Sequence, residues 1–416
     1  MRIVIIGSGI AGHSACRAVL ESSKETEIVL ITKEVVPLYS PCVLPHYLAG
    51  EISKEKVFLS GEFENGDDRV RLMAGSTVSQ INRVQKHLIL DHETLSYDQL
   101  ILALGGYSVI PTLKGIDLPG VFHFKTLADV EKLLRWPGEK TVVVGSGPIG
   151  VEVAAALRRR GRAVCLVEFL DQLLPNILDP SPAKIVEAIL GEAGIEIILG
   201  ERVVSLEGKD RVEAVLTDKQ TIPADSVVFA IGIRPEVDLA EKGGIKIGPL
   251  GGIVTDSFLR TNDPNIWACG DCIESFDVIT QLPVLNMLWP NAREQGSIAG
   301  LNSTGGTRLY KGSFSFVTVT ILNTFIFSMG RTSRSLVGAT VKEKESEKGY
   351  TRLLIQENRL AGVQIIGDDS LAGMIVPNIL NPERLLSLKT HSSRWNFLFP
   401  IPYPQNLMAL LNNSTL

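Results

Sequence analysis

The sequence predicts an α/β fold that contains two similar strand–loop–helix units, and three observations support this prediction. An apolar strand runs into a glycine-rich loop at residues 7–12 and again at residues 145–150. Each loop is followed by a stretch of small and apolar residues typical of a helix, the order found in nucleotide-binding α/β domains. The chain has 416 residues, which is long for one hydrophobic core and indicates two or three domains.

The first loop, GSGIAG, follows the apolar strand Ile3–Ile6. Glycine suits three positions here: Gly7 makes the tight turn, Gly9 lets the backbone approach a pyrophosphate, and Gly12 lets helix and strand pack closely. The following helix would present free N–H groups and a positive dipole end to the phosphates. The flanking strand and helix make this a much stronger signal than the glycine spacing alone.

The second loop, GSGPIG, follows the strand Thr141–Val144, and the next strand, Ala163–Val167, ends in Glu168. A carboxylate at that strand end accepts hydrogen bonds from both hydroxyls of an adenosine ribose and would repel a 2′-phosphate. The three residues that follow, 169–171, offer no cation for such a phosphate, and the nearest arginines precede the strand. The second loop therefore favours NAD(H) over NADP(H).

The first unit has no matching carboxylate at its second strand end. The strand reaches Thr32 where an acid is expected, and Glu34 follows two positions later. Either Glu34 contacts the ribose or the site relies on Thr32, and the sequence leaves this open. Two loops still indicate two dinucleotides, and the natural chemistry for such a pair is hydride transfer between a nicotinamide and a flavin.

Three further strand ends indicate which dinucleotide each unit binds. The apolar strand at 99–104 ends in Gly105-Gly106, and the strand at 226–231 ends in Gly232. The stretch TNDPNIWACGDC ends near Gly270-Asp271, where an aspartate can hydrogen-bond the ribityl hydroxyls of a flavin. Together with both loops, these stretches resemble the flavoprotein pyridine nucleotide–disulfide oxidoreductase superfamily over most of the first three hundred residues.

The resemblance implies two Rossmann-like, three-layer domains, with the NAD domain inserted in the FAD domain. Their limits would be 1–112 and 228–303 for the FAD domain and 113–227 for the NAD domain. Residues 304–416 would form a C-terminal mixed α/β interface domain with an apolar tail. A helix over residues 288–302 would point its N-terminus at the flavin and stabilise the reduced, anionic form.

The resemblance also implies two sets of binding residues. The FAD site would combine the first loop, several strand ends and the start of the later helix: Gly7, Gly9, Ile10, Ala11, Gly12, Thr32, Lys33, Glu34, Cys42, Ala103, Leu104, Gly105, Gly270, Asp271, Trp289, Pro290 and Ala292. The NAD(H) site would combine the second loop with the strand ends beside it: Gly145, Gly147, Pro148, Ile149, Gly150, Glu152, Glu168 and Gly232.

Cys42 is the candidate catalytic residue. Its setting, Ser40-Pro41-Cys42 before a Pro- and Tyr-containing helix, resembles the NADH oxidase, NADH peroxidase and coenzyme A-disulfide reductase branch of the superfamily. That branch places the sulfur beside the flavin, where it forms a mixed disulfide with coenzyme A or a sulfenic acid. The alternative is a buried cysteine in a flavoprotein that passes electrons elsewhere. No second cysteine lies within five residues, which excludes a dithiol of the glutathione reductase kind.

Three functions are compatible with these features. We expect an NAD(H)-linked FAD subunit of a larger oxidoreductase complex, whose iron–sulfur clusters would lie on a partner subunit. Two departures from the branch favour it: Ile10 stands where peroxidases carry a histidine, with His13 just beyond the loop, and the tail at 391–413 is unfamiliar. The alternatives are a free-standing, homodimeric NADH oxidase or coenzyme A-disulfide reductase that uses Cys42, and a non-catalytic FAD/NAD redox sensor.

The remaining features exclude other classes of protein. The net charge of -5 and the lack of a dense basic run argue against nucleic-acid binding. The uncharged stretch 314–329 alternates apolar and polar residues, which predicts two strands and a turn rather than a membrane span. An N-terminus that starts directly in a strand indicates a cytoplasmic protein. The tail either covers the chain's own core or dimer or docks on another subunit.

The other cysteines are expected to be structural. Five scattered cysteines suit a reducing compartment rather than a disulfide framework. Cys269 and Cys272 flank the Gly-Asp motif and would supply only two ligands, so no metal site is predicted there. Cys16 and Cys165 fall on a helix and a strand, where core packing is the expected role.

Overall fold

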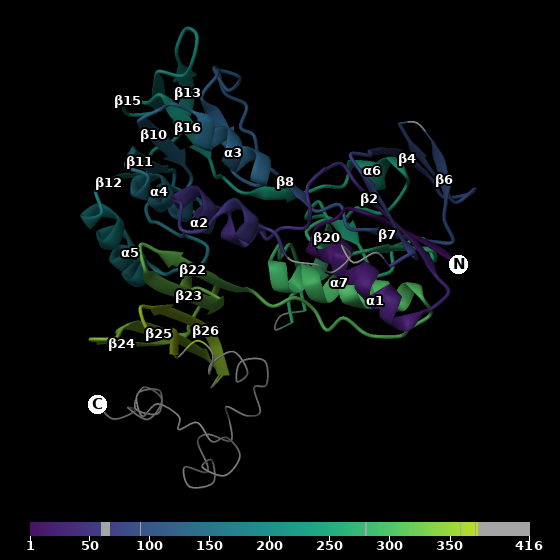
Figure 1. Ribbon diagram of the computed structural model, residues 1–416. Helices are drawn as coiled ribbons and strands as arrows, with labels where there is room; N and C mark the ends of the chain where they lie inside the picture. The colour runs from purple at the N-terminus through teal and green to yellow at the C-terminus, as the bar shows by residue number, and fades with distance from the viewer. Residues whose placement is uncertain (60–66, 92, 279–280, 358, 371, 373–416) are drawn as a thin grey trace. The chain divides into compact units, whose positions relative to one another are not determined.

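The structure is a computed structural model that describes residues 1–59, 67–91, 93–278, 281–357, 359–370 and 372 (Figure 1). The chain divides into two compact units. Unit 1 comprises Met1–Val109, Lys125–Val130 and Gly232–Ser315, and unit 2 comprises Ile110–Phe124, Glu131–Ile231 and Phe316–Leu416. Each unit contains a parallel sheet and helices, which confirms the predicted α/β fold. The limits of the three domains given above stay a prediction.

The main sheet of unit 1 has five strands in the order β19-β7-β1-β2-β3, and all neighbours are parallel. Its strands are β1 (Arg2–Ile6), β2 (Glu27–Thr32), β3 (Val70–Ala74), β7 (Gln99–Leu102) and β19 (Ile266–Ala268). A parallel strand covered on both faces needs a continuous apolar run, and the run Ile3 to Ile6 is buried throughout. The first loop therefore begins at the carboxyl end of β1, at the edge of a well-packed sheet.

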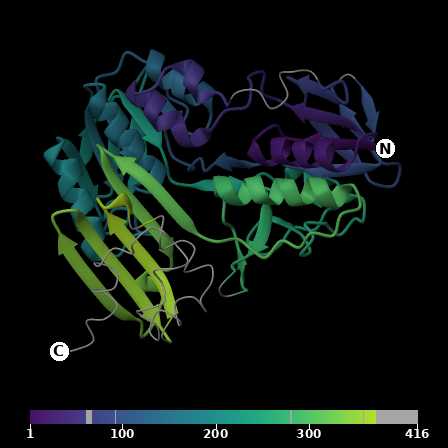
Figure 2. The same cartoon turned by 60° about the horizontal axis from the view of Figure 1, so that its bottom comes forward.

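The helices α1 (Ile10–Ser22) and α7 (Trp289–Ser303) lie side by side in unit 1, as both ribbon views show (Figures 1 and 2). A glycine on α7 permits this close approach. A Cβ at Gly296 would lie 2.1 Å from the carbonyl oxygen of Ala11. The helix predicted for this later part of the sequence is present, and it packs directly on the helix that follows the first loop.

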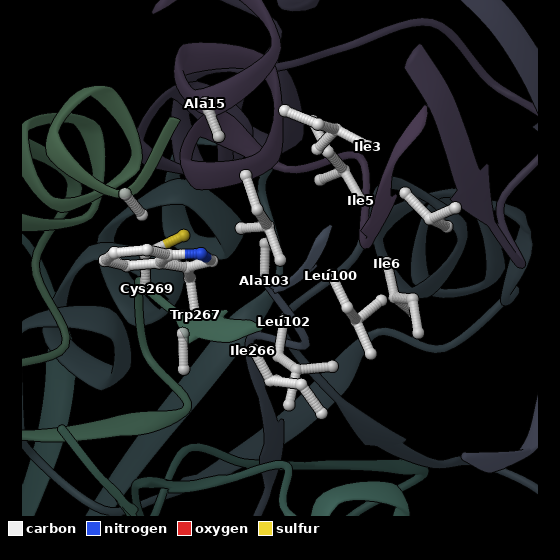
Figure 3. Packing of buried hydrophobic residues seen from close by; sticks show 14 of the residues in the cluster. Ile3, Ile5, Ile6, Ala15, Leu100, Leu102, Ala103, Ile266, Trp267 and Cys269 are labelled. Carbon is white, nitrogen blue, oxygen red and sulfur yellow. The ribbon is translucent and has the colours of Figure 1, made fainter. Parts of the chain in front are cut away.

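The core of unit 1 joins residues from its first and last segments (Figure 3). Ile5 of β1, Leu102 of β7 and Ile266 of β19 are fully buried in one cluster. Trp267 belongs to the same cluster, and its indole N–H donates to Gln99 Oε1 at 2.9 Å. This core fixes the strand ends from which the first loop and the Gly-Asp motif emerge.

Smaller elements complete unit 1. Its short helical segments are η1 (Pro41–Val43), α2 (Leu44–Ala49), η2 (Lys54–Val57) and α6 (Asp238–Lys242). Its further strands form three small sheets: β4 (Val78–Asn82), β5 (His87–Leu90) and β6 (Thr94–Ser96); β8 (Gly106–Ser108) and β17 (Ile233–Pro235); β18 (Ile253–Val254), β20 (Ile273–Phe276) and β21 (Pro283–Val284).

The first sheet of unit 2 repeats the parallel arrangement, in the order β12-β11-β10-β16-β9. Its strands are β9 (Val121–His123), β10 (Lys140–Val144), β11 (Ala163–Glu168), β12 (Ile195–Leu199) and β16 (Ser226–Phe229). The unit also contains α4 (Pro148–Arg159), α5 (Pro180–Glu192), β13 (Val203–Glu207), β14 (Ala214–Thr217) and β15 (Thr221–Pro223). The limits of the two units divide α3 (Leu127–Arg135) after Val130. The second loop leaves the carboxyl end of the central strand, β10.

A second sheet of unit 2 is antiparallel, in the order β22-β23-β26-β25-β24. Its strands are β22 (Phe316–Ile321), β23 (Thr324–Gly330), β24 (Thr340–Ser346), β25 (Gly349–Gln356) and β26 (Arg359–Ile366). β22 and β23 form the hairpin predicted from the alternating pattern, and no described helix is long and apolar enough to cross a membrane. Residues 373–416 of the predicted C-terminal domain, which include the tail at 391–413, lie outside the described residues.

A buried ion pair joins this antiparallel sheet to the parallel part of unit 2. Arg352 Nε donates to Asp179 Oδ2 at 2.8 Å, and the Asp179 side chain is fully buried. Ser333 donates to the other carboxylate oxygen through its N–H at 2.8 Å and its hydroxyl at 2.7 Å. Every carboxylate oxygen thus has a donor, as a buried charge requires.

Candidate dinucleotide sites

The first loop has the geometry that a pyrophosphate site requires. Gly7 has a φ of +107°, and a Cβ there would lie 2.0 Å from the Ala103 carbonyl oxygen. A Cβ at Gly12 would lie 1.9 Å from the Gly7 carbonyl oxygen. At Gly9 a Cβ would meet no described atom within 4 Å. Gly7 and Gly12 are therefore required by the fold, whereas Gly9 faces open space where phosphates can approach the backbone.

The Gly-Asp motif also fits a flavin. Gly270 has a φ of +83°, and its N–H donates to Gln295 Oε1 of α7 at 2.8 Å. Burial raises the pKa of Asp271, with a smaller opposing effect from Lys125. Among the described residues nothing donates a hydrogen bond to the Asp271 carboxylate. A partly buried carboxylate with free acceptor capacity is suited to the hydroxyls of a ribityl chain.

A cavity of about 1160 Å³ lies in unit 1 beside the first loop and α1. Among the predicted FAD residues, Ile10, Thr32 and Trp289 line it, whereas Lys33 and Glu34 do not. The Glu34 carboxylate instead faces Tyr39, and together with burial it raises the pKa of the Tyr39 hydroxyl. Of the two alternatives at this strand end, Thr32 is the residue that borders the cavity.

Ser8 of the first loop has a partner that sequence reasoning did not identify. Its hydroxyl lies 2.9 Å from His13 Nε2, and both residues line the cavity. His13 is buried, and burial lowers its pKa from 6.5 to about 4, so the imidazole is neutral at pH 7. The sequence drew attention to Ile10, although His13, one turn into the helix, was the signal that could have revealed this pair.

The second loop repeats the backbone geometry of the first. Gly145 has a φ of +99°, and a Cβ there would lie 2.6 Å from the Ala230 carbonyl oxygen. A Cβ at Gly150 would lie 1.9 Å from the Gly145 carbonyl oxygen, whereas one at Gly147 would meet no described atom within 4 Å. The second loop thus offers the same open approach for a pyrophosphate.

Glu168, at the end of β11, holds the second loop directly. Its Oε2 accepts hydrogen bonds from Ser146 N at 2.8 Å and from the Ser146 hydroxyl at 2.7 Å, and its Oε1 accepts one from Leu170 N at 2.9 Å. Glu168 is 9% exposed. Glu152, which was predicted for the same site, lies in the second turn of α4, and burial raises its pKa from 4.5 to about 8.

Residues 169–171 offer no cation, but a cation from a more distant part of the sequence lies next to this strand end. The Arg202 guanidinium carbon is 4.5 Å from the ring centroid of Phe169. Arg202 follows β12, which pairs with β11 in parallel, so Arg202 and Phe169 become neighbours although 33 positions separate them in sequence. Two of the arginines that precede β11, Arg158 and Arg162, donate to backbone carbonyls of other segments.

Cys42 lies in the η1 turn directly before α2, and its side chain is exposed. The reading of Cys42 as a buried cysteine is therefore wrong. The other cysteines are buried as expected: Cys16, Cys165, Cys269 and Cys272. In the part of the chain that the structure describes, no group of three or more His, Cys, Asp or Glu residues could hold a metal ion.

Comparison with known proteins agrees with this geometry. The pattern of the family described as pyridine nucleotide-disulphide oxidoreductase matches residues 1–296. The chain is 37% identical to the NADH oxidase of Methanocaldococcus jannaschii over 73% of its own length and 70% of the relative. A solved NAD-dependent persulfide reductase from A. fulgidus superimposes with a TM-score of 0.87 and 26% identity, over 91% of this chain and 76% of that chain.

Two further relatives are subunits of larger enzymes by name. The chain is 30% identical to the NADH-dependent phenylglyoxylate dehydrogenase subunit epsilon of Aromatoleum evansii, over 82% of the chain and 80% of the relative. It is also 30% identical to the assimilatory nitrate reductase electron transfer subunit of Bacillus subtilis, over 88% of the chain. The chain spans only 48% of that second relative's length.

Proposed function

The chain belongs to the pyridine nucleotide-disulphide oxidoreductase family, and from this premise we propose that it is the NAD(H)-linked FAD subunit of a larger oxidoreductase complex. As a member of that family, the chain is an NAD(H)-dependent flavoprotein oxidoreductase. The proposal concerns the partner that exchanges electrons with the flavin. Electrons would pass between this chain and an iron–sulfur partner rather than a small thiol substrate.

The residues on each loop have defined tasks in this proposal. The open backbone at Gly9 and the N-terminus of α1 bind the FAD pyrophosphate, while Asp271 accepts hydrogen bonds from ribityl hydroxyls. The open backbone at Gly147 binds the NAD(H) pyrophosphate, and Glu168 holds the loop. When bound, FAD supplies the chemistry that joins a two-electron hydride donor to one-electron acceptors.

The observation that carries the proposal is the likeness to the phenylglyoxylate dehydrogenase subunit epsilon. It covers 82% of this chain and 80% of that subunit, so little of either protein is left unmatched. The likeness to a nitrate reductase electron transfer subunit supports the same direction. Ile10, which stands where peroxidase members carry a histidine, agrees with an acceptor other than peroxide. A cytoplasmic location and assembly with a cluster-bearing subunit remain part of the proposal.

The test is the choice of electron acceptor. The purified, FAD-loaded chain is reduced anaerobically with NADH and mixed in a stopped-flow instrument with a bacterial ferredoxin or with coenzyme A disulfide. We expect the ferredoxin to reoxidise the wild-type protein rapidly and to reoxidise the Cys42→Ser variant at the same rate. Reoxidation by coenzyme A disulfide alone, lost in Cys42→Ser, would contradict the proposal.

A second function is favoured by one specific observation. Cys42 is exposed, as a thiol that meets a soluble disulfide must be. A free-standing NADH oxidase or coenzyme A-disulfide reductase is therefore the alternative, and the 37% identity to an NADH oxidase agrees with it. A non-catalytic redox sensor is the remaining candidate, and failure of NADH to bleach the flavin absorbance would favour it.

A further inference from the structure

An exposed cation stands at the carboxyl end of β11, where the adenosine end of a nicotinamide dinucleotide binds in this kind of fold. The Arg202 guanidinium lies over the ring of Phe169 at 4.5 Å from its centroid. Phe169 directly follows Glu168 and is 54% exposed. Stacking on an aromatic face limits the motion of a guanidinium but leaves the N–H groups on its edge free to donate.

The backbone holds this arginine in place. Gly200 N donates to Leu170 O at 2.9 Å, and Glu201 N donates to Glu168 O at 3.1 Å, so the segment after β12 runs beside the end of β11. Arg202 N in turn donates to Asp218 Oδ1 at 3.0 Å. The position of Arg202 beside Glu168 therefore follows from sheet pairing and loop hydrogen bonds, not from a freely moving loop.

The acidic residues close in sequence to Arg202 and Phe169, Glu201 and Asp171, are already engaged. Glu201 accepts from the Thr217 hydroxyl at 2.7 Å and from Gln220 Nε2 at 3.0 Å. Asp171 pairs with Arg334 at 3.1 Å. Among the described residues none forms an ion pair with the Arg202 guanidinium. The full charge and the N–H donors of Arg202 are thus available to a ligand.

Glu168 is less of an obstacle to a phosphate than its sequence position suggested. Three donors from Ser146 and Leu170 hold its two oxygens, and the side chain is almost fully buried. A carboxylate held by three donors repels a nearby anion less than a bare one, because those dipoles offset its field. Its remaining lone pairs can still accept a hydrogen bond from a ribose hydroxyl.

We propose that Arg202 broadens the dinucleotide specificity of the second site. It lets the site bind NADPH, through the 2′-phosphate, as well as NADH, which carries a free 2′-hydroxyl. A guanidinium edge matches phosphate geometry and forms strong, charge-assisted hydrogen bonds. This inference deepens the hydride-donor side of the proposed function and does not depend on which acceptor takes the electrons.

The test is nucleotide binding to the FAD-loaded full chain, measured by isothermal titration calorimetry with 2′,5′-ADP and with 5′-ADP. Wild type is compared with Arg202→Gln and with Arg211→Gln, an exposed arginine between β13 and β14 that serves as the charge-matched control. We expect Arg202→Gln to weaken 2′,5′-ADP about tenfold or more, the effect of one charge-assisted hydrogen bond, while 5′-ADP affinity stays within about twofold. Arg211→Gln should change neither affinity.

Three results would overturn the inference. Wild type that does not bind 2′,5′-ADP lacks the phosphate site altogether. An Arg202→Gln variant that loses affinity equally for both nucleotides assigns Arg202 to adenine packing alone. A variant with unchanged affinity for both removes Arg202 from the site. If Arg202→Gln melts well below wild type, Arg202→Lys keeps the charge without the fork and should give an intermediate loss for 2′,5′-ADP only. No arm uses an electron acceptor, so failure here is separable from failure of the proposed function.

Discussion

The two glycine-rich loops share the sequence GSGxxG and the same backbone geometry, but their serines bind different partners. In unit 2, Ser146 donates to the buried carboxylate of Glu168. In unit 1, the equivalent Ser8 pairs with the imidazole of His13. The strand end explains the difference, because unit 1 has Thr32 where unit 2 has Glu168. A loop of one shape is thus supported by an anion in one unit and by a neutral ring in the other.

This comparison shows that the backbone and the side chains of each loop have different roles. The glycines set the shape of each loop and leave its phosphate side open, so they repeat closely between the units. The residue that holds the loop serine sets the local charge, and there the units differ. At the proposed sites, the neutral Ser8–His13 pair would place no negative charge beside the pyrophosphate, whereas Glu168 would place one next to the ribose.

The glycines should show the largest effects and separate the two cofactors. Gly12→Ala and Gly150→Ala force a Cβ to within 1.9 Å of a carbonyl oxygen, so each should lower the free energy of unfolding by about 1–3 kcal/mol or more. Gly9→Ala and Gly147→Ala meet open space and should leave the stability of the ligand-free protein within about 0.5 kcal/mol of wild type. Gly9→Ala should lose FAD, and Gly147→Ala should lose NADH binding only.

Urea unfolding of FAD-stripped protein measures the stability changes, and the ratio of flavin absorbance to protein absorbance measures FAD retention. A Gly9→Ala variant that keeps its FAD would show that the pyrophosphate lies elsewhere. Equal stability loss in all four variants would remove the distinction between glycines required by the fold and glycines required by the ligand.

Removing the carboxylate of the second loop should have the next largest effect. Glu168→Leu leaves the Ser146 and Leu170 donors without an acceptor, which costs about 1–3 kcal/mol of unfolding free energy. It also removes the ribose acceptor, so the Kd for NADH should rise about tenfold. Thr32→Val is the matched change in unit 1, where the threonine hydroxyl accepts a 3.2 Å bond from Glu34 N. Chemical denaturation and NADH fluorescence titration should show little change in Thr32→Val; similar losses in both variants would contradict the comparison.

Glu152 of α4 should make stability depend on pH in the alkaline direction. Burial raises its pKa from 4.5 to about 8, so the folded state resists ionisation. The protonated Glu152 carboxyl therefore makes its full contribution to stability below pH 4.5, and this contribution is lost as pH rises to 8. Glu152→Gln should therefore gain stability relative to wild type across this window, by at most about 1.4 kcal/mol per pH unit, and by a constant amount above pH 8. Melting curves from pH 5 to 9 that run parallel for both proteins would refute this.

His13 should show the opposite and smaller dependence. Burial lowers its pKa from 6.5 to about 4, so its contribution is present above pH 6.5 and is lost as pH falls to 4. Arg17 and Glu21 of α1 and Arg293 of α7 line the same cavity. Wild type should lose stability relative to His13→Gln between pH 6.5 and 4, by at most about 1.4 kcal/mol per pH unit. Urea midpoints at half-unit intervals provide the measurement, and equal slopes would place His13 in solvent.

The sequence was sufficient for features that depend on local chemistry. Glycine spacing located both loops, since only glycine allows the turn at Gly7 and the close packing at Gly12. Alternation along 314–329 predicted the β22–β23 hairpin, and the Gly-Asp motif located the strand end at Asp271. In each case the pattern and its cause lie within a few residues of each other.

Features formed by contacts between distant segments could not be predicted. Arg202 reaches Phe169 only because β12 pairs with β11, and nothing near residue 202 marks it as a partner of the strand end. The choice between Thr32 and Glu34 depended on Tyr39, which draws the Glu34 carboxylate away from the cavity.

The most direct measurement is an anaerobic NADH titration of the FAD-loaded chain and its Cys42→Ser variant, followed by absorbance. A subunit that passes electrons to a separate cluster needs no redox thiol. Both proteins should therefore take up about two electrons per flavin and end with the same spectrum. If wild type takes up about two more electrons than the variant, or shows a thiolate–flavin charge-transfer band that the variant lacks, Cys42 is the acceptor and the chain is a thiol-linked enzyme instead.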